Sequence, residues 1–395
     1  MWQIDRDILR IFLPSSGERF IDSINNRAPF FALTVAYTDT VQLPGISGAG
    51  VSEELRELTA QADAEILYHG KALCLPGGVP SNPTGTPGPS IITRAAFDLL
   101  PGCGYVCVDA GLKTPPQMPG VISPPGAGPA RAITTGQALG QDEKRAAQLF
   151  TSGWQIGDQL GRTNAANGYL LLAESVPGGT TTALGLLLGL GINAERRVSS
   201  SMPGNTAHEL KLEAVRSGFA AAGKTKGAFV RNPLSAAASL GDPMQPVVAG
   251  MALAASKYLP VVLAGGTQMA AVLALAAALS RSEGDTLSGV DFTGVNFENI
   301  ALVTTGWVAN DPSSDLAGLA AEIEECFGPL GSAYLATNLN FAASTVPAMR
   351  LYEAGFVKEG VGAGAAAFAA MLAVNLSAQE FLPAIEAACR KLVEN

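Results

Sequence analysis

Residues 170–193 read LLLAESVPGGTTTALGLLLGLGIN, an apolar strand that passes through one acidic residue and a Gly/Thr loop into a second apolar stretch. We expect Glu174 at the carboxyl end of the strand. The loop suits a phosphate, because glycines let the backbone approach a ligand and hydroxyls and amides at a helix N-terminus donate to oxyanions. The same composition also caps helices that bind no ligand, so both interpretations stay open. The loop residues are Gly178, Gly179, Thr180, Thr181 and Thr182.

Short apolar runs alternate with Ala-rich stretches along the chain, a pattern typical of a parallel sheet covered by helices on both faces. We expect a doubly wound, mostly parallel, Rossmann-like α/β fold in a single domain over residues 1–395. Residues 140–165 and the C-terminal helices are expected to form a small helical subdomain. The predicted strands are 30–37, 104–110, 169–174, 227–230, 259–264, 300–305 and 333–339, and the predicted helices are 52–62, 142–160, 182–190, 207–222, 247–257, 268–280, 314–326 and 364–374.

The composition argues against several classes of partner. Charged residues make up 15% of the chain and the net charge is −9, which does not favour binding to nucleic acid. Five scattered cysteines and two histidines lack the spacing of metal ligands and fit a reducing cytoplasm. The charged N-terminus lacks the apolar core of a signal peptide, and Lys257 and Pro260 interrupt the apolar stretch 246–280. We therefore expect a cytoplasmic protein that binds neither nucleic acid nor membrane.

Several other segments combine glycines with polar side chains. Segments 75–89 and 114–129 are rich in Pro and Gly and are predicted to be loops, either over a site or as surface connections. Four further segments place polar residues at strand ends or on a helix, a combination that suits a phosphorylated sugar. They are VDAGLK (108–113) with Asp109, NTAHELKLEAV (205–215) with Lys211, LPVVLAGGTQMAAVL (259–273) and FVKEGVGAGAAA (356–367) with Glu359.

Taken in this order, the segments resemble the nicotinate-nucleotide:dimethylbenzimidazole phosphoribosyltransferase family, in particular its shorter archaeal and cyanobacterial-type branch. The resemblance covers most of residues 104–395. The segment AESVPGGTTTA is similar to the family's GExGxxNTTxA loop, KLEAVR to its KxxVVR helix, and PVVLAGGTQMAAVL to its PVLLDGFxSxAAxL run. The sharpest match is KEGVGAGAA, which is similar to GEGSGAAL.

The resemblance implies roles for individual residues. Glu359 is expected to be the catalytic base with support from Glu174, and loop 178–182 with Lys211 is expected to bind the substrate phosphate. The implied substrates are nicotinate mononucleotide and a base of benzimidazole or purine type, giving an α-ribotide for the lower ligand of a cobamide. No metal or other cofactor is implied, because no pyrophosphate leaves, and the expected assembly is a homodimer. Further substrate contacts are expected from Asp109, Gly265, Gly266, Thr267, Gln268, Gly360 and Gly362.

The chain also departs from the family pattern. Gly179 and Thr180 replace a Gly/Ala-Asn step, Ala264 stands where the family has an aspartate, and the PPGSLG motif of the bacterial enzymes is missing. Two other functions therefore stay open. One is a nucleotide sensor without turnover, and the other is a dinucleotide-dependent oxidoreductase, since GISGAG (45–50) superficially resembles a dinucleotide loop. Glu359 could also be a helix-terminus acid, Lys211 a solvated lysine, and Asp109 a turn cap.

Overall fold

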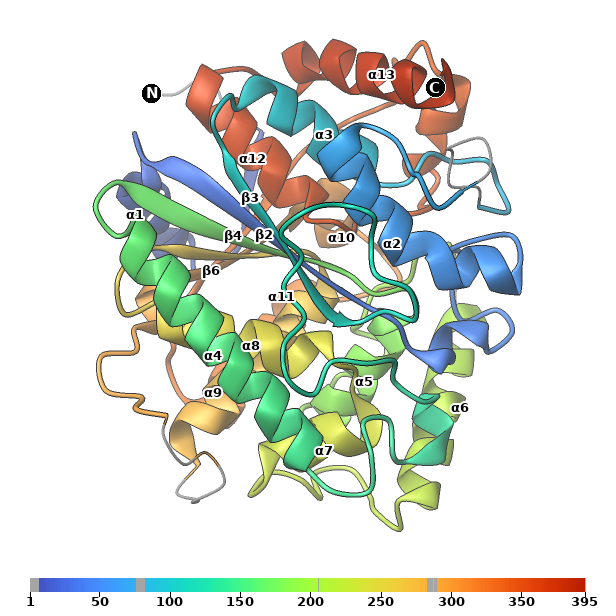
Figure 1. Cartoon of the computed structure of the whole chain (residues 1–395), viewed down its shortest axis with the longest axis vertical. Helices are drawn as coiled ribbons and strands as arrows, with labels where there is room; N and C mark the ends of the chain where they lie inside the picture. Colours follow the sequence, from blue (N-terminus) through green and yellow to red (C-terminus); the bar gives the residue numbers. More distant parts are fainter. Residues whose placement is uncertain (1–6, 76–81, 205, 283–286, 288–289, 395) are drawn as a thin grey trace.

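The computed structural model describes residues 7–75, 82–204, 206–282, 287 and 290–394. These residues form a seven-stranded sheet with the strand order β1-β7-β6-β5-β4-β2-β3 (Figure 1). All neighbouring strands are parallel except the edge pair of β1 and β7. The mostly parallel α/β sheet is therefore confirmed. The strands are β1 (Ile8–Phe12), β2 (Ala28–Ala36), β3 (Gly104–Gly111), β4 (Gly168–Ser175), β5 (Val261–Ala264), β6 (Ile300–Thr305) and β7 (Ala333–Thr337).

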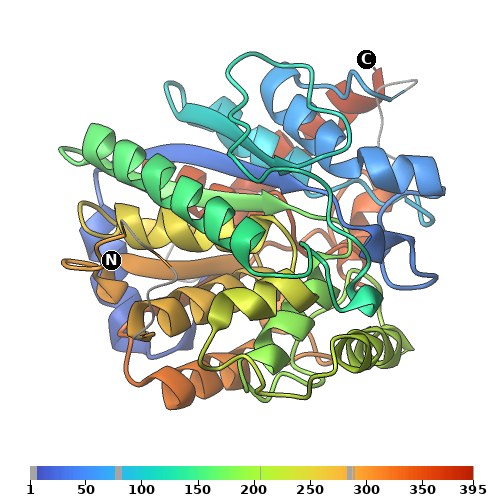
Figure 2. The same cartoon turned by 60° about the horizontal axis from the view of Figure 1, so that its bottom comes forward.

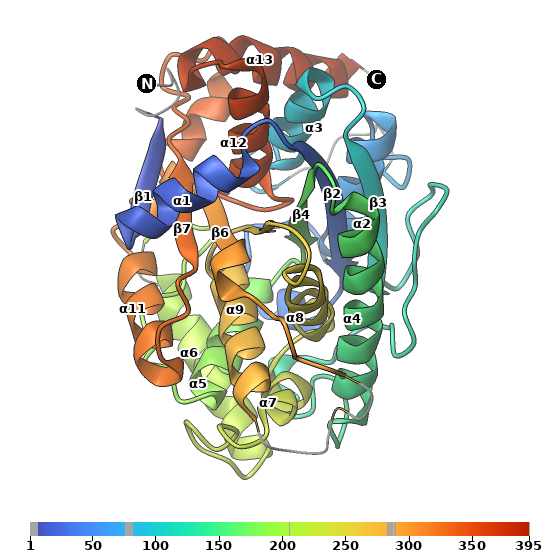
Figure 3. The same cartoon turned by 90° about the vertical axis from the view of Figure 1, so that its left-hand side faces the viewer.

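Helices cover both faces of the sheet, as Figure 3 shows. Alternate residues of β4 point to opposite faces, so Leu170 and Leu172 join one apolar core while Leu171 and Ala173 join the other. The first core includes α4 (Lys144–Asn164), α5 (Gly179–Gly189), α6 (Thr206–Ala221), α7 (Pro233–Leu240), α8 (Met244–Ala255), α9 (Thr267–Arg281) and α11 (Leu316–Phe327). The second includes α1 (Pro14–Ile24), α2 (Glu53–His69), α3 (Ser90–Leu99), α12 (Ala363–Val374) and α13 (Ala378–Glu394).

Helices α4 and α8 are in backbone contact. A Cβ atom on Gly153 would lie 2.1 Å from the carbonyl oxygen of Val247, and one on Gly157 would lie 2.3 Å from that of Met251. Only glycine fits at such positions. Helix α4 thus belongs to the first core, whereas α12 and α13 lie on the other face against α3. The small subdomain expected from these segments stays a prediction.

One predicted strand is wrong. Residues 227–230 form turns after α6, because the amide of Gly227 donates to the carbonyl of Leu188 at 2.9 Å and that of Phe229 to Gly189 at 3.1 Å. The apolar side chain of Phe229 is buried in the first core, so its hydrophobicity reflects packing and not a strand. Sequence patterns also missed β1, α1 and α13 near the two ends of the chain, and α3 and α7 within it.

The shorter elements complete the chain, with α10 at Gly306–Ala309 and 3-10 helices η2 (Asp39–Gln42), η3 (Ile133–Thr135), η5 (Phe297–Asn299) and η6 (Pro347–Tyr352). Among the described residues no single helix is long and apolar enough to cross a membrane, and α12 and α13 reach that length and composition only as a pair bent by 118°.

Candidate active site

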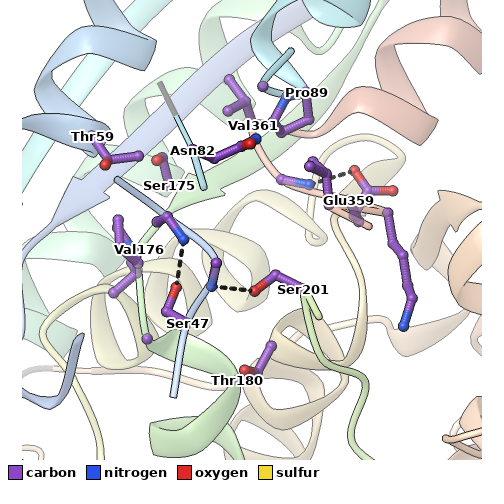
Figure 4. Close-up of a pocket in the computed structure, with 18 of the residues that line it drawn as sticks. Ser47, Thr59, Asn82, Pro89, Ser175, Val176, Thr180, Ser201, Glu359 and Val361 are labelled. Carbon is purple, nitrogen blue, oxygen red and sulfur yellow. Dashed lines mark hydrogen bonds between the residues drawn. The ribbon is translucent and has the colours of Figure 1, made fainter. Parts of the chain in front are cut away.

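A pocket lies where the parallel strands end. Figure 2 shows the strands side by side, with their carboxyl ends directed toward α2 and α5, and Figure 4 shows the pocket itself. Ligands of open α/β sheets bind outside these strand ends. The pocket wall combines the end of β4, the starts of α5 and α9, and the loop before α12 with part of α2 and the segments 47–50, 82–89 and 199–202, as far as these are described.

Glu174 is the acidic residue near the carboxyl end of β4. It lines this pocket with 4% of its surface exposed. Its Oε2 atom accepts a hydrogen bond from the amide of Val176 at 3.1 Å. The pKa of Glu174 is raised to about 8, chiefly by burial and to a smaller extent by the nearby carboxylates of Asp242 and Glu359. Glu174 therefore holds a proton at neutral pH in a large fraction of molecules.

Glu359 is the second carboxylate of the pocket, and it is half-buried in the loop before α12. Its Oε1 accepts from the amides of Gly360 at 3.1 Å and Gly364 at 3.3 Å, and Thr304 Oγ1 donates to Oε2 at 3.1 Å. Burial raises the pKa of Glu359 to about 7 against the opposing effect of these bonds. A carboxylate with this pKa changes protonation near neutral pH, as a general base requires.

The turn that carries Glu359 has an unusual backbone. Val357, Lys358 and Val361 have φ values of 67°, 66° and 56°, a left-handed conformation that side chains other than glycine rarely adopt. The amide of Val357 donates to Ser201 O at 3.0 Å, and the amide of Val361 donates to Glu174 O at 2.9 Å. The turn thus connects the two carboxylate-bearing segments.

Lys358 holds this turn from within the protein. Its ammonium group donates to Ser200 O at 2.9 Å and forms an ion pair with Asp311 Oδ2 at 2.7 Å, and both side chains are buried. The backbone carbonyl of Lys358 accepts a hydrogen bond from Thr305 Oγ1 at 2.6 Å. Sequence reasoning did not assign Lys358 a role, although a lysine directly beside the expected base in an apolar segment was an available signal.

The structure brings about half of the predicted site residues into the pocket wall. Glu174, Gly178, Thr180, Gly266, Thr267, Gln268, Glu359 and Gly360 line it. The remaining predicted residues are not among those that line the pocket. They are Asp109, Gly179, Thr181, Thr182, Lys211, Gly265 and Gly362.

Several of the residues behind the wall have other contacts. Lys211, 1% exposed, donates to the carbonyl of Ser199 at 2.6 Å, and burial lowers its pKa to about 7. Thr182 Oγ1 donates to Asp242 Oδ2 at 2.6 Å. Asp109 accepts from the amides of Gly111 and Leu112, the turn-capping arrangement that the sequence had left open.

Other polar side chains reach the pocket that sequence motifs did not single out. Asp63 on α2 lines the wall and accepts from Ser175 Oγ at 2.7 Å, and Asn82 lines it from the loop before α3. Sequence patterns gave no direct signal for Asp63, because it lies one residue beyond the predicted helix 52–62 and the observed α2 continues to His69. The described part of segment 75–89 lies over the pocket, whereas segment 114–129 runs beside β3, where Ile122 N donates to Cys107 O at 2.9 Å.

The pocket favours an anion at one end. Helices α5, α9 and α12 all begin beside it, and the positive ends of their dipoles point toward the cavity. Gly178 has φ of 82°, and a Cβ there would lie 3.0 Å from Val41 N. The described residues contain no group of three or more His, Cys, Asp or Glu side chains arranged to hold a metal ion.

The GISGAG loop lines the pocket but lacks the context of a dinucleotide fingerprint. The 3-10 helix η2 separates it from β2, so no strand leads directly into the glycines. The oxidoreductase hypothesis therefore loses its structural basis, because the fingerprint requires a strand, a tight turn and a helix in succession.

Sequence comparison assigns the family. The chain is 41% identical to the UPF0284 protein of Rippkaea orientalis over 370 residues, covering 94% of this chain and 95% of that protein. It is 43% identical to the UPF0284 protein of Synechocystis sp. over 358 residues, covering 91% and 90%. The chain belongs to the UPF0284 family. No model in a scan of protein families matches it.

Two solved structures are similar in fold to this UPF0284 protein. It is similar to nicotinate-nucleotide-dimethylbenzimidazole phosphoribosyltransferase from Thermus thermophilus, with a TM-score of 0.51 and 16% identity over 90% of this chain and 85% of that one. It is also similar to CobT from the same organism, with a TM-score of 0.53 and 16% identity over 93% and 97%. The resemblance drawn from the sequence motifs is confirmed at the level of fold.

Proposed function

We propose that this UPF0284 protein transfers the phosphoribosyl group of nicotinate mononucleotide to an azole base, releasing nicotinate and forming an α-ribotide. The observation that carries the proposal is the pair Glu174 and Glu359, two carboxyl groups with raised pKa that share one pocket at the carboxyl ends of the strands. The likeness in fold to a phosphoribosyltransferase of the same chemistry supports it.

The reaction needs one base. Nicotinate leaves the ribose C1′ with the bonding electron pair on its ring nitrogen, so the leaving group requires no acid. The incoming azole must lose its N–H proton as the new C–N bond forms. Glu359 accepts that proton, and a positioned carboxylate contributes about 10² to 10⁴ in rate. Glu174 lies close enough to Glu359 for the charge on Glu359 to raise the pKa of Glu174, which favours the protonated form of Glu174 beside the base.

The anionic end of the nucleotide fits the opposite part of the pocket. The N-terminus of α5 with Thr180 and that of α9 with Thr267 offer amides and hydroxyls to a phosphate. Lys211 acts through the carbonyl of Ser199 and not by direct contact, so it is a positioning residue of the 199–202 segment. The homodimer and a place in the synthesis of a cobamide lower ligand belong to the same proposal.

The test is incubation with nicotinate mononucleotide and a panel of azole bases, scored for free nicotinate. We expect release with at least one base, and a loss of roughly 10²-fold or more in turnover for Glu359→Gln, because an amide cannot accept the proton. Glu213→Gln on the exposed side of α6 is the matched control and should not change the rate. If the protein binds nicotinate mononucleotide but releases no nicotinate with any of the bases, the result would contradict a transferase and favour a nucleotide sensor.

A further inference from the structure

The pocket has two chemically different ends. In Figure 4 Ser47, Thr180 and Ser201 lie on one side, and Thr59, Asn82, Pro89 and Val361 lie on the other, with Glu359 beside both groups. The first end consists of hydroxyls and backbone amides near helix N-termini, which suits the phosphate and ribose. The second end has apolar side chains from Pro89 and Val361, and Leu55, one turn before Thr59 on α2, and Pro83, next to Asn82, also line the pocket. A flat heteroaromatic acceptor fits apolar walls of this kind.

Most polar side chains at the apolar end are already engaged. Thr59 Oγ1 donates to the carbonyl of Leu55 at 2.9 Å. Asn82 is bonded within its own loop, because Oδ1 accepts from the amides of Thr84 and Thr86 at 3.0 Å each and Nδ2 donates to the carbonyl of Thr86. These contacts leave neither side chain well placed to select a ligand.

Asp63 differs from these residues. It is 5% exposed on α2 and lines the pocket, where Ser175 Oγ donates to its Oδ2 at 2.7 Å and the nearby Ser90 hydroxyl also stabilises its charged form. An ionised carboxylate has about four lone-pair sites, so acceptor capacity remains for a ligand. Ser175 directly follows Glu174, so Asp63 is fixed to the strand end that carries Glu174. Burial raises the pKa of Asp63 to about 6, so it is mostly a carboxylate at pH 7.5, and no ion pair of the described residues includes it. A carboxylate only accepts hydrogen bonds.

We propose that Asp63 is a specificity-determining residue that selects acceptor azoles carrying an N–H donor, such as an amino group, on the edge remote from the reacting nitrogen. The inference rests on the proposed function, since it names the acceptor class of the same pocket. An apolar ligand that covers this buried carboxylate leaves part of its acceptor capacity unsatisfied, and sites of this kind discriminate strongly against analogues that lack the donor.

The experiment compares 5-aminobenzimidazole with 5-methylbenzimidazole, which have nearly the same shape. Calorimetric titration of the intact protein should show the amino compound binding about 10 to 100 times more tightly. In Asp63→Ala, which removes both acceptor oxygens, the preference should fall to within about threefold, whereas Glu57→Gln, on the same helix but paired with Lys113 away from the pocket, should keep it. Ser175→Ala, which leaves the carboxylate in place, should also keep most of the preference. If Asp63→Ala does not fold, Asp63→Leu is the second variant without an acceptor oxygen.

Equal affinity of the wild-type protein for the two azoles, or an unchanged preference in a folded Asp63→Ala or Asp63→Leu variant, would overturn the assignment. The nicotinate-release assay separates this inference from the proposed function. A binding preference that depends on Asp63 without any release supports the acceptor site and refutes the transferase. Release with both azoles at equal efficiency supports the transferase and refutes the role of Asp63.

Discussion

Replacing Glu174 by glutamine should make the protein more stable above neutral pH while lowering its activity. The pKa of Glu174 is about 8 in the folded protein against 4.5 when exposed, because burial disfavours the charged form. Below pH 4.5 the side chain is protonated in both states and costs nothing. Between pH 4.5 and 8 the folded state keeps a proton that the unfolded state has lost, so stability falls as the pH rises, and the fall ends above pH 8.

The size of the effect follows from the width of this window. One pH unit is worth about 1.4 kcal/mol for one proton, so the interval from pH 5 to pH 8 corresponds to about 4 kcal/mol at most. Glu174→Gln removes the titrating group, and the glutamine carbonyl oxygen can still accept from the Val176 amide. We therefore expect the variant to gain a few kcal/mol relative to the wild-type protein between these pH values.

The assay is urea unfolding at pH 5, 6, 7 and 8, followed by tryptophan fluorescence. The difference in unfolding free energy between variant and wild type should grow steadily with pH. Glu213→Gln, at an exposed position of α6, controls for the loss of one formal charge and should show no such trend. Parallel pH dependences for Glu174→Gln and the wild-type protein would refute the reasoning, since they would mean that Glu174 ionises alike in both states.

Three other substitutions test residues in the pocket wall or directly behind it. Gly179→Val should abolish binding of nicotinate mononucleotide and spare the acceptor base, because a Cβ there would lie 2.9 Å from Gln268 Cδ; equal loss of both affinities in calorimetry would contradict a phosphate loop. Lys211→Met should weaken nucleotide binding by about 1 to 3 kcal/mol by releasing Ser199, and an unchanged dissociation constant would exclude this role. Lys358→Met should destabilise the protein by about 3 to 5 kcal/mol in urea unfolding, with recovery when its aspartate partner is also replaced by leucine.

Local patterns predicted much of the fold and the central pair of the site. The run that ends at Glu174 is an apolar strand followed by glycines, and a parallel sheet places such a strand end at the ligand-binding edge whatever its neighbours are. Glu359 was recognisable because it directly precedes the glycines that open α12. The turn at 227–230 was misassigned because a short apolar run shows that a segment is buried but not which backbone it adopts.

The amino-acid sequence by itself determined the strand and helix alternation and the two carboxylates at strand and helix ends, since each depends on neighbours within a few residues. Only the tertiary structure decided which polar groups meet. Asp63 and Ser175 are 112 residues apart and Lys358 and Asp311 are 47 apart, and their contacts depend on how α2 and the turn before α12 are rotated against the sheet. Periodicity records burial but not the partner of a buried charge, so these pairings could not be predicted from local patterns.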